Sequence, residues 1–185
     1  MKCLDCGALI IQLDLDTMEW QAGSTGARDF TIPTEDSPSG RPITGALWLP
    51  DNHDLSTPLI LCGHGASGDR YQAPIGHLAK RLLRECGFAT LALDGPVHGL
   101  RQVGVGGREA LAEEMRRTGF IDDMVSDWLH ALERLPGAAG IGNGPLGYFG
   151  LSMGTIFGLP LRAAAPGTGV SSVSFRHLRA HETVV

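Results

Sequence analysis

Gly150-Leu151-Ser152-Met153-Gly154 is the stretch that decides the fold, because it is a G-x-S-x-G sequence between an apolar run and a helical one. Residues 145–150 before it predict a short buried strand, and residues 155–165 after it predict a helix. A serine on a tight strand-to-helix turn has a strained backbone and an exposed hydroxyl, and flanking glycines leave room for the turn to close. The pattern therefore indicates a nucleophilic serine if the rest of the chain supplies the same setting.

The composition indicates one globular domain. The chain has 185 residues, of which 43% are hydrophobic and 19% charged, which is enough apolar material for one core. A formal net charge of −5 argues against a nucleic-acid partner. No apolar run approaches the about 20 residues that cross a bilayer, and the N-terminus lacks a signal-peptide pattern. We therefore expect a cytoplasmic protein without a membrane partner.

The four cysteines do not predict a metal site. Cys3 and Cys6 form a C-x-x-C pair, but a structural zinc site needs four ligands and the sequence offers no second pair. Cys62 lies in an apolar run and Cys86 ends a helical one, so we expect both to behave as small buried hydrophobic residues. No metal ion is expected.

Several short segments predict the strands and the first helix of a sheet protein. Residues 58–62 and 88–93 are unbroken apolar runs, which suit strands buried on both faces. Between them, residues 75–86 repeat apolar side chains at helical spacing and predict a crossover helix. Residues 30–33 and 41–50 are rich in strand formers and predict an antiparallel pair at one edge of the sheet.

Two helical segments, broken near Gly119, fill the stretch between the second buried strand and the strand before Ser152. The longer one carries a single apolar stripe, and we expect Asp127 and Glu133 beside that stripe to face solvent or cap the helix. A loop is predicted over residues 137–144. The alternation of strands and helices predicts an α/β fold with a mostly parallel sheet flanked by helices on both faces.

Polar residues follow three of the predicted strands at their carboxyl ends. His64 follows the first buried strand, Asp94 and His98 follow the second, and Ser152 follows the third. In open α/β sheets, functional residues gather beyond the carboxyl ends of the strands. The sequence therefore predicts a candidate site at this end of the sheet.

The chain resembles the α/β-hydrolase family over residues 41–165. Three features carry the resemblance: the His64-Gly65-Ala66-Ser67-Gly68 loop, the loop from Asp94 to Gly99, and the G-x-S-x-G elbow. The sequence is most similar to the esterase, dienelactone hydrolase and prolyl-oligopeptidase-like branch. The resemblance implies a serine-dependent hydrolase of carboxylic esters or related acyl bonds, with a small-molecule acyl substrate and an acyl-enzyme on Ser152.

The resemblance also implies roles for other residues. The backbone N–H groups of Ala66 and Met153 would form the oxyanion hole, which stabilises negative charge on the tetrahedral oxygen. His64 would brace its loop, and His98 would line the pocket or make structural hydrogen bonds. Acyl transfer of this kind needs no metal or organic cofactor.

The family places the triad acid and histidine after the nucleophile, yet only residues 153–185 follow Ser152. We therefore expect residues 1–185 to form a single domain that is incomplete at its C-terminal end. Residues 166–185 are an atypical tail, such as a truncated gene model or a shifted reading frame would produce. Three downstream residues are of triad type: His177, His181 and Glu182. Their position one short strand past the elbow helix argues against them.

The incomplete triad leads us to expect weak or absent esterase activity and leaves two alternatives open. One is a peptidase or acyltransferase of the same family, and the other is a non-catalytic remnant or binding scaffold. Residues 170–175 predict one more short strand. An edge of the sheet that is bare or covered only by this tail predicts self-association.

Overall fold

A seven-stranded mixed sheet runs through the molecule in the order β1-β2-β3-β5-β4-β6-β7. The computed structural model describes residues 18–165 and 170–176, so Cys3, Cys6, His177, His181 and Glu182 lie outside it. Antiparallel pairing joins β1 to β2, β2 to β3 and β3 to β5. Parallel pairing joins β5, β4, β6 and β7. The strands are β1 (Glu19–Ala22), β2 (Arg28–Ile32), β3 (Ile43–Trp48), β4 (Leu59–Gly63), β5 (Ala89–Leu93), β6 (Leu146–Leu151) and β7 (Val170–Arg176).

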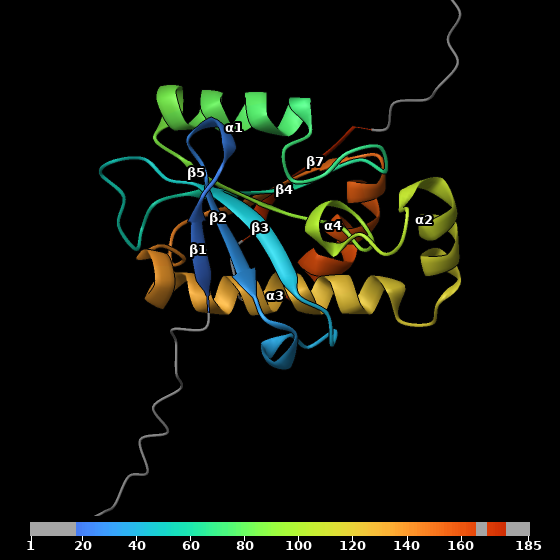
Figure 1. The fold of residues 1–185 in the computed structure, drawn as a ribbon. Helices are drawn as coiled ribbons and strands as arrows, with labels where there is room; N and C mark the ends of the chain where they lie inside the picture. Colours follow the sequence, from blue (N-terminus) through green and yellow to red (C-terminus); the bar gives the residue numbers. More distant parts are fainter. Residues whose placement is uncertain (1–17, 166–169, 177–185) are drawn as a thin grey trace, which may run out of the picture.

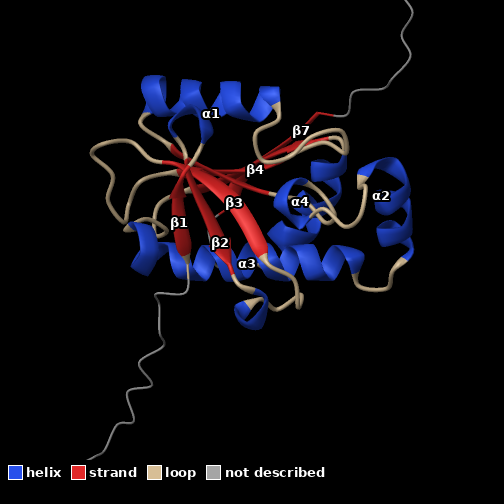
Figure 2. Cartoon of the chain, viewed as in Figure 1, coloured by secondary structure: helices blue, strands red, loops and turns tan. Residues whose placement is uncertain are grey.

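Helices cover both faces of the sheet, as the alternating pattern predicts. Helix α1 (Ala73–Cys86) lies above the sheet in Figure 1, and the long helix α3 (Phe120–Ala139) lies below it. Helix α4 (Met153–Ala164) packs against α3, β4 and β6, and α2 (Gly107–Arg116) contacts α3 (Figure 2). Three short 3₁₀ turns complete the described elements: η1 (Ser24–Gly26), η2 (Thr34–Asp36) and η3 (Gly99–Arg101).

The core consists of two hydrophobic clusters. The larger cluster includes Trp128 of α3 and Phe157 of α4, which are 0% and 2% exposed. The smaller cluster includes Ile75 and Ala79 of α1 together with Trp48 of β3. Full burial of a large apolar side chain contributes about 1.5–3 kcal/mol, so these contacts hold the helices on the sheet.

The predicted loop over residues 137–144 begins later than expected, because α3 continues through Pro136 and ends at Ala139. Leu135 and Ala139 are 0% and 7% exposed, and their burial favours one more helical turn over the break that a proline usually causes. Gly140, with φ of 65°, provides the left-handed residue that ends the helix. The prediction was wrong at this helix end.

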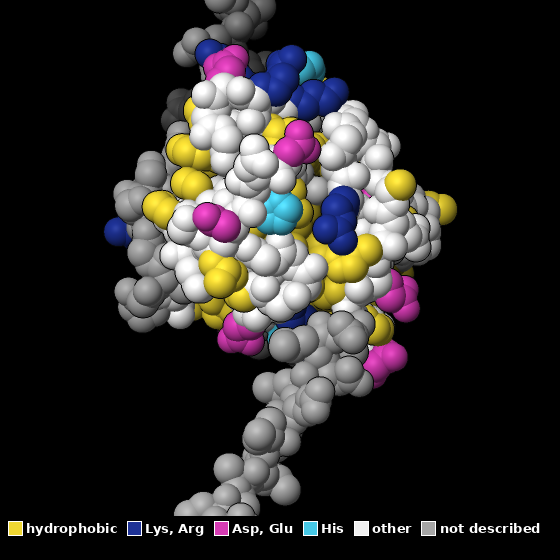
Figure 3. Space-filling view, turned by 90° about the vertical axis from the view of Figure 1, so that its left-hand side faces the viewer, with side chains coloured by type: hydrophobic (Ala, Val, Ile, Leu, Met, Phe, Trp, Pro, Cys, Tyr) yellow, Lys and Arg dark blue, Asp and Glu magenta, His cyan; other side chains and the backbone are white. Residues whose placement is uncertain are grey.

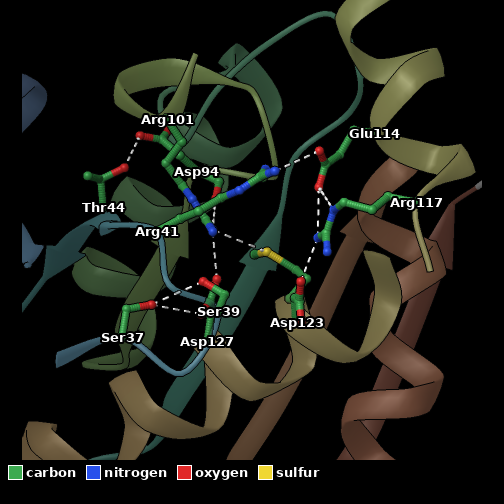
Figure 4. A network of polar contacts seen from close by, with 12 residues as sticks. Ser37, Ser39, Arg41, Thr44, Asp94, Arg101, Glu114, Arg117, Asp123 and Asp127 are labelled. Carbon is green, nitrogen blue, oxygen red and sulfur yellow. Dashed lines mark hydrogen bonds and ion pairs between the residues drawn. The ribbon is translucent and has the colours of Figure 1, made fainter. Parts of the chain in front are cut away.

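Asp127 is also placed differently from the prediction. It is 0% exposed, whereas Glu133 is exposed as expected. The Asp127 carboxylate accepts hydrogen bonds from Arg101 of η3 at 2.6 Å and from Ser37 at 3.3 Å (Figure 4). Both donors come from distant loops, which is why the pattern of α3 alone gives no sign of this burial.

The edges of the sheet are formed by one strand that the sequence predicted and one that it missed. Residues 170–176 form β7 and pair in parallel with β6, with a register shift between Leu146 and Gly147. Strand β1 has a short, mostly exposed sequence with no alternation, so periodicity did not reveal it. None of the helices within the described ranges is long and apolar enough to span a membrane.

Candidate active site

Ser152 lies at the turn between β6 and α4 with an unusual backbone conformation. Its φ of 48° and ψ of −110° lie outside the regions that residues with a side chain favour. Such a conformation costs about 1–3 kcal/mol and persists only where the surrounding structure enforces it. The serine side chain is exposed, so the turn presents the hydroxyl at the carboxyl end of β6.

The glycines on either side of Ser152 are required by close packing. A Cβ atom on Gly154 would lie 2.2 Å from the carbonyl oxygen of Gly63 at the end of β4, and a Cβ on Gly150 would lie 2.9 Å from the amide nitrogen of Thr155. The Tyr148 hydroxyl donates to the carbonyl oxygen of Gly154 at 2.6 Å and fastens β6 to α4. These contacts explain sterically why the elbow has this sequence.

The loop after β4 lies opposite this elbow and is held by several hydrogen bonds. The Gln72 side chain accepts from the amide of Gly65 at 2.7 Å, and the amide of Gly68 donates to the Gly65 carbonyl at 3.1 Å. His98 contacts the Ala66 carbonyl at 3.0 Å. Within residues 18–165 and 170–176, the amide of Ala66 has no hydrogen-bond partner, so it is available to a ligand.

A second free donor comes from the elbow itself. Met153 is the first residue of α4, where an amide has no acceptor within the helix. The N-terminal end of a helix also favours negative charge, because the backbone dipoles point their positive ends there. Ala66 lines the same pocket as Ser152, and Met153 follows Ser152 directly in the chain.

A pocket of about 680 Å³ opens at this place. Its lining comes from the loop after β4, the elbow and α2, and comprises Gly65, Ala66, Ser67, Gln72, Gly107, Arg108, Leu111, Leu151 and Ser152. A second hollow of about 570 Å³ shares Ala66, Ser67 and Gly107 with the first and is lined by His98. The segment that carries the Ala66 amide is thus a wall between two hollows.

His64 lies below this loop and connects it to the loop after β5. It is 1% exposed; its Nδ1 lies 2.8 Å from the Gly65 carbonyl oxygen, and the Gly95 amide donates to Nε2 at 2.7 Å. An acceptor on Nε2 and a donor on Nδ1 describe a neutral ring, and burial lowers the pKa of His64. Both ring nitrogens are engaged, which supports a bracing role.

Asp94 belongs to a buried polar network, part of which Figure 4 shows. It is 0% exposed and accepts hydrogen bonds from the Thr44 hydroxyl at 2.6 Å and from the Arg70 guanidinium at 2.7 Å. The amides of Arg70 and Leu100 also donate to it, at 3.0 and 3.2 Å. Arg70 extends to Asp29 of β2 at 2.9 Å. Asp94 therefore holds in place the two loops near the site that carry Arg70 and Leu100.

Sequence reasoning missed Gln72, Arg70 and Thr44 as supports of the site. Each acts through a side chain that reaches a backbone or carboxylate from another segment, and none belongs to a recognisable motif. The Ser152 hydroxyl has no hydrogen-bond partner among the described residues. The sequence-based candidates for a proton acceptor, His177 and His181, lie outside those residues.

No protein-family model and no curated protein sequence matches this chain. Among solved structures, a cold-adapted esterase from an Arctic intertidal metagenomic library is 27% identical with a TM-score of 0.66, over 85% of this chain and 65% of that one. Dienelactone hydrolase from Anabaena variabilis is 22% identical with a TM-score of 0.58, over 86% of this chain and 63% of that one. A carboxyl esterase from Bacillus coagulans is 17% identical with a TM-score of 0.56, over 82% of this chain and 44% of that one. The chain spans less than two thirds of the length of each.

Proposed function

Since this chain is a member of the α/β-hydrolase fold family, we propose that it is a serine-dependent hydrolase of carboxylic esters or related acyl bonds. The observation that carries the proposal is the strained backbone of Ser152, with φ of 48° and ψ of −110°, at the mouth of a pocket. Nothing in a purely structural turn requires a serine there, because glycine adopts this conformation at no steric cost. The esterase at 27% identity supports the same reaction class.

In the proposed reaction, the Ser152 Oγ attacks the acyl carbon, and the carbonyl oxygen becomes an oxyanion. The amides of Ala66 and Met153 donate to that oxygen, and each such donor lowers the barrier by about 3–4 kcal/mol in comparable proteases. Collapse of the intermediate expels the alcohol, and water then releases the acid from the acyl-enzyme. No metal or organic cofactor takes part in these steps.

The proton of Ser152 needs an acceptor from outside the described residues. If neither His177 nor His181 reaches Ser152, turnover is weak, because loss of the triad histidine costs about a millionfold in a serine protease. Oxyanion stabilisation and substrate binding still leave a rate about 10³–10⁴ times that of the reaction in water. We therefore expect reactivity at Ser152 to be easier to detect by covalent labelling than by turnover.

The test is labelling of the full chain by a fluorophosphonate probe, with Ser152→Ala and with Ser56→Ala as a matched control. Ser56 lies in an exposed loop, where it bonds only to Asp54. We expect label on the wild type and on Ser56→Ala, and none on Ser152→Ala. Absence of label on folded wild-type protein, or label on Ser152→Ala, would refute the proposal and favour a non-catalytic scaffold.

A further inference from the structure

The side chain of Gln72 contacts the loop after β4 on both sides of Ala66. Its Oε1 accepts from the Gly65 amide at 2.7 Å, and its Nε2 donates to the Ser67 hydroxyl at 3.3 Å. Gly68 packs along the same side chain, since a Cβ atom there would lie 2.8, 2.7 and 2.6 Å from the Cβ, Cγ and Cδ of Gln72. One side chain thus contacts the residue before Ala66 and the two residues after it.

The peptide group between Gly65 and Ala66 has its carbonyl turned into the loop. The Gly68 amide donates to this carbonyl at 3.1 Å, and His64 Nδ1 lies 2.8 Å from it. No peptide bond among the described residues is cis, so this group is trans and planar. Its N–H therefore points opposite to its carbonyl, away from His64 and Gly68. Ala66 lines the pocket of Ser152, and this orientation leaves its amide available to a ligand.

This orientation needs support from outside the backbone. A rotation of the peptide group would turn the Ala66 amide away and its carbonyl partner toward the pocket, and Gly65 has no Cβ to oppose the rotation. Such a rotation changes ψ of Gly65 and φ of Ala66, so contacts on both sides of the peptide group restrict it. The two hydrogen bonds of Gln72 lie on these two sides.

Gln72 also occupies the N-cap position of α1 without capping the helix. Ser, Thr, Asp and Asn are preferred at an N-cap, because their side chains accept from an amide of the first turn. Among the described residues, the Gln72 side chain makes no capping bond and contacts the loop instead. The side chain at this position therefore serves the loop rather than the stability of the helix.

We propose that Gln72 is a positioning residue that keeps the Ala66 amide directed at the oxyanion. The inference rests on the proposed function, because the direction of this amide matters for catalysis only if Ser152 forms an oxyanion. In this role Gln72 acts through Gly65 and Ser67. Its loss lets the peptide group before Ala66 populate rotated states, so fewer molecules have a complete oxyanion hole.

The first test measures fluorophosphonate labelling of Ser152 at several probe concentrations in Gln72→Met, Gln72→Asn and the control Gln21→Asn. Methionine keeps the length of the side chain without its hydrogen bonds, whereas asparagine is a better N-cap but one methylene shorter. We expect the maximal labelling rate to fall about tenfold in both Gln72 variants, the effect of one lost hydrogen bond. The probe concentration at half-maximal rate should stay within about twofold, because oxyanion donors act on the transition state. Gln21 is exposed on β1, and its variant should match the wild type.

Thermal melting of the same proteins separates positioning from stability. We expect the melting temperature of Gln72→Asn to lie within about 4 °C of the wild type, since the new N-cap offsets the lost loop contact. Its labelling rate should fall all the same. A wild-type labelling rate in either Gln72 variant contradicts the proposal, as does a loss of rate that occurs only with a larger fall in melting temperature.

The second test follows hydrogen exchange of the Gly65 amide by NMR in the full chain. We expect exchange about five- to tenfold faster in Gln72→Met than in the wild type, because the amide loses its acceptor. Equal exchange in the two proteins overturns the proposal even where Ser152 is labelled. Absence of label on folded wild-type protein refutes the proposed function and this inference with it, whereas a labelled wild type with unaffected Gln72 variants refutes this inference alone. The failures of the two ideas are therefore distinguishable.

Discussion

At Ser152 a single residue carries both the strain and the exposed hydroxyl of the elbow. The residues that maintain this strained backbone leave no room for a larger side chain. The Cα of Gly154 approaches the backbone of β4, and any side chain at this position would collide with it. Rigid backbone on both sides of this contact cannot move without separating α4 from the sheet. The strained backbone of Ser152 and the close contact of α4 with β4 therefore depend on the same short turn.

The substitution Gly154→Ala tests this packing. Its Cβ would lie 2.2 Å from the Gly63 carbonyl oxygen, so we expect the free energy of unfolding to fall by about 3 kcal/mol. The matched control is Gly76→Ala in α1, where the nearest atom lies 3.9 Å away. Alanine there should raise the free energy of unfolding by about 0.5–1 kcal/mol. Urea denaturation measures both, and similar effects of the two changes would contradict the argument.

His64 makes stability depend on pH. Burial lowers its folded-state pKa from the ordinary 6.5, so below that pH the unfolded chain binds a proton that the folded chain does not. The stability is fully present above about pH 6.5 and falls with acidification by up to about 1.4 kcal/mol per pH unit. We expect the difference between wild type and His64→Gln in urea denaturation to shrink from pH 7.5 to pH 5. The change Gly76→Ala, which removes no titratable group, should show no such trend.

Among the elements, η3 and α3 are joined by the buried ion pair of Arg101 and Asp127 (Figure 4). Their side chains are 3% and 0% exposed, and Arg101 also donates to the Asp94 carbonyl at 3.2 Å. Helix α2 is fastened in a similar way by Glu114, which lies 2.9 Å from Arg41 and 2.9 Å from Arg117. Charged groups therefore hold the segment that borders the pocket.

Removing one partner of the buried pair should lower the free energy of unfolding far more than replacing both partners with apolar residues. Asp127→Ala leaves the Arg101 charge buried and unpaired, and we expect a loss of about 3–5 kcal/mol in the free energy of unfolding. The double change Arg101→Met with Asp127→Leu should recover most of it. Glu85→Ala, which breaks the exposed Arg81–Glu85 pair of α1, should cost less than about 1 kcal/mol. Equal losses of unfolding free energy in the single and double variants would contradict this prediction.

The elements that could be predicted are those whose apolar pattern is typical of only one type of secondary structure. The unbroken runs of β4 and β5 and the stripe of α3 specified strand and helix correctly. The elbow was found because its glycines and serine have fixed spacing. Asp127 was misread because its partner Arg101 comes from a separate loop. The supports of the site, such as Gln72, depend on contacts that only the folded chain creates.

For the whole molecule, the sheet has its described edges at β1 and β7. The face in Figure 3 shows acidic and basic side chains interspersed with apolar ones, without one dominant sign of charge. An unpaired strand edge is a place where two copies can join.

We therefore expect self-association, measured by size-exclusion chromatography with light scattering. Ser172→Lys places a charge on β7 and should shift the protein toward the monomer, because lysine on an edge strand opposes pairing. Asn52→Lys adds the same charge in an exposed loop and should leave the distribution unchanged. A monodisperse wild-type monomer would contradict the prediction.

The strand order also has a consequence for synthesis. Strand β4 lies between β5 and β6, and both follow it in the chain. On the ribosome, β4 is synthesised before either neighbour, and its second side stays open until residue 151 has been added. At about 5–20 residues per second, a strongly apolar segment waits for several seconds without its partners. The centre of the sheet is thus left without one of its neighbours for most of the synthesis of the sheet.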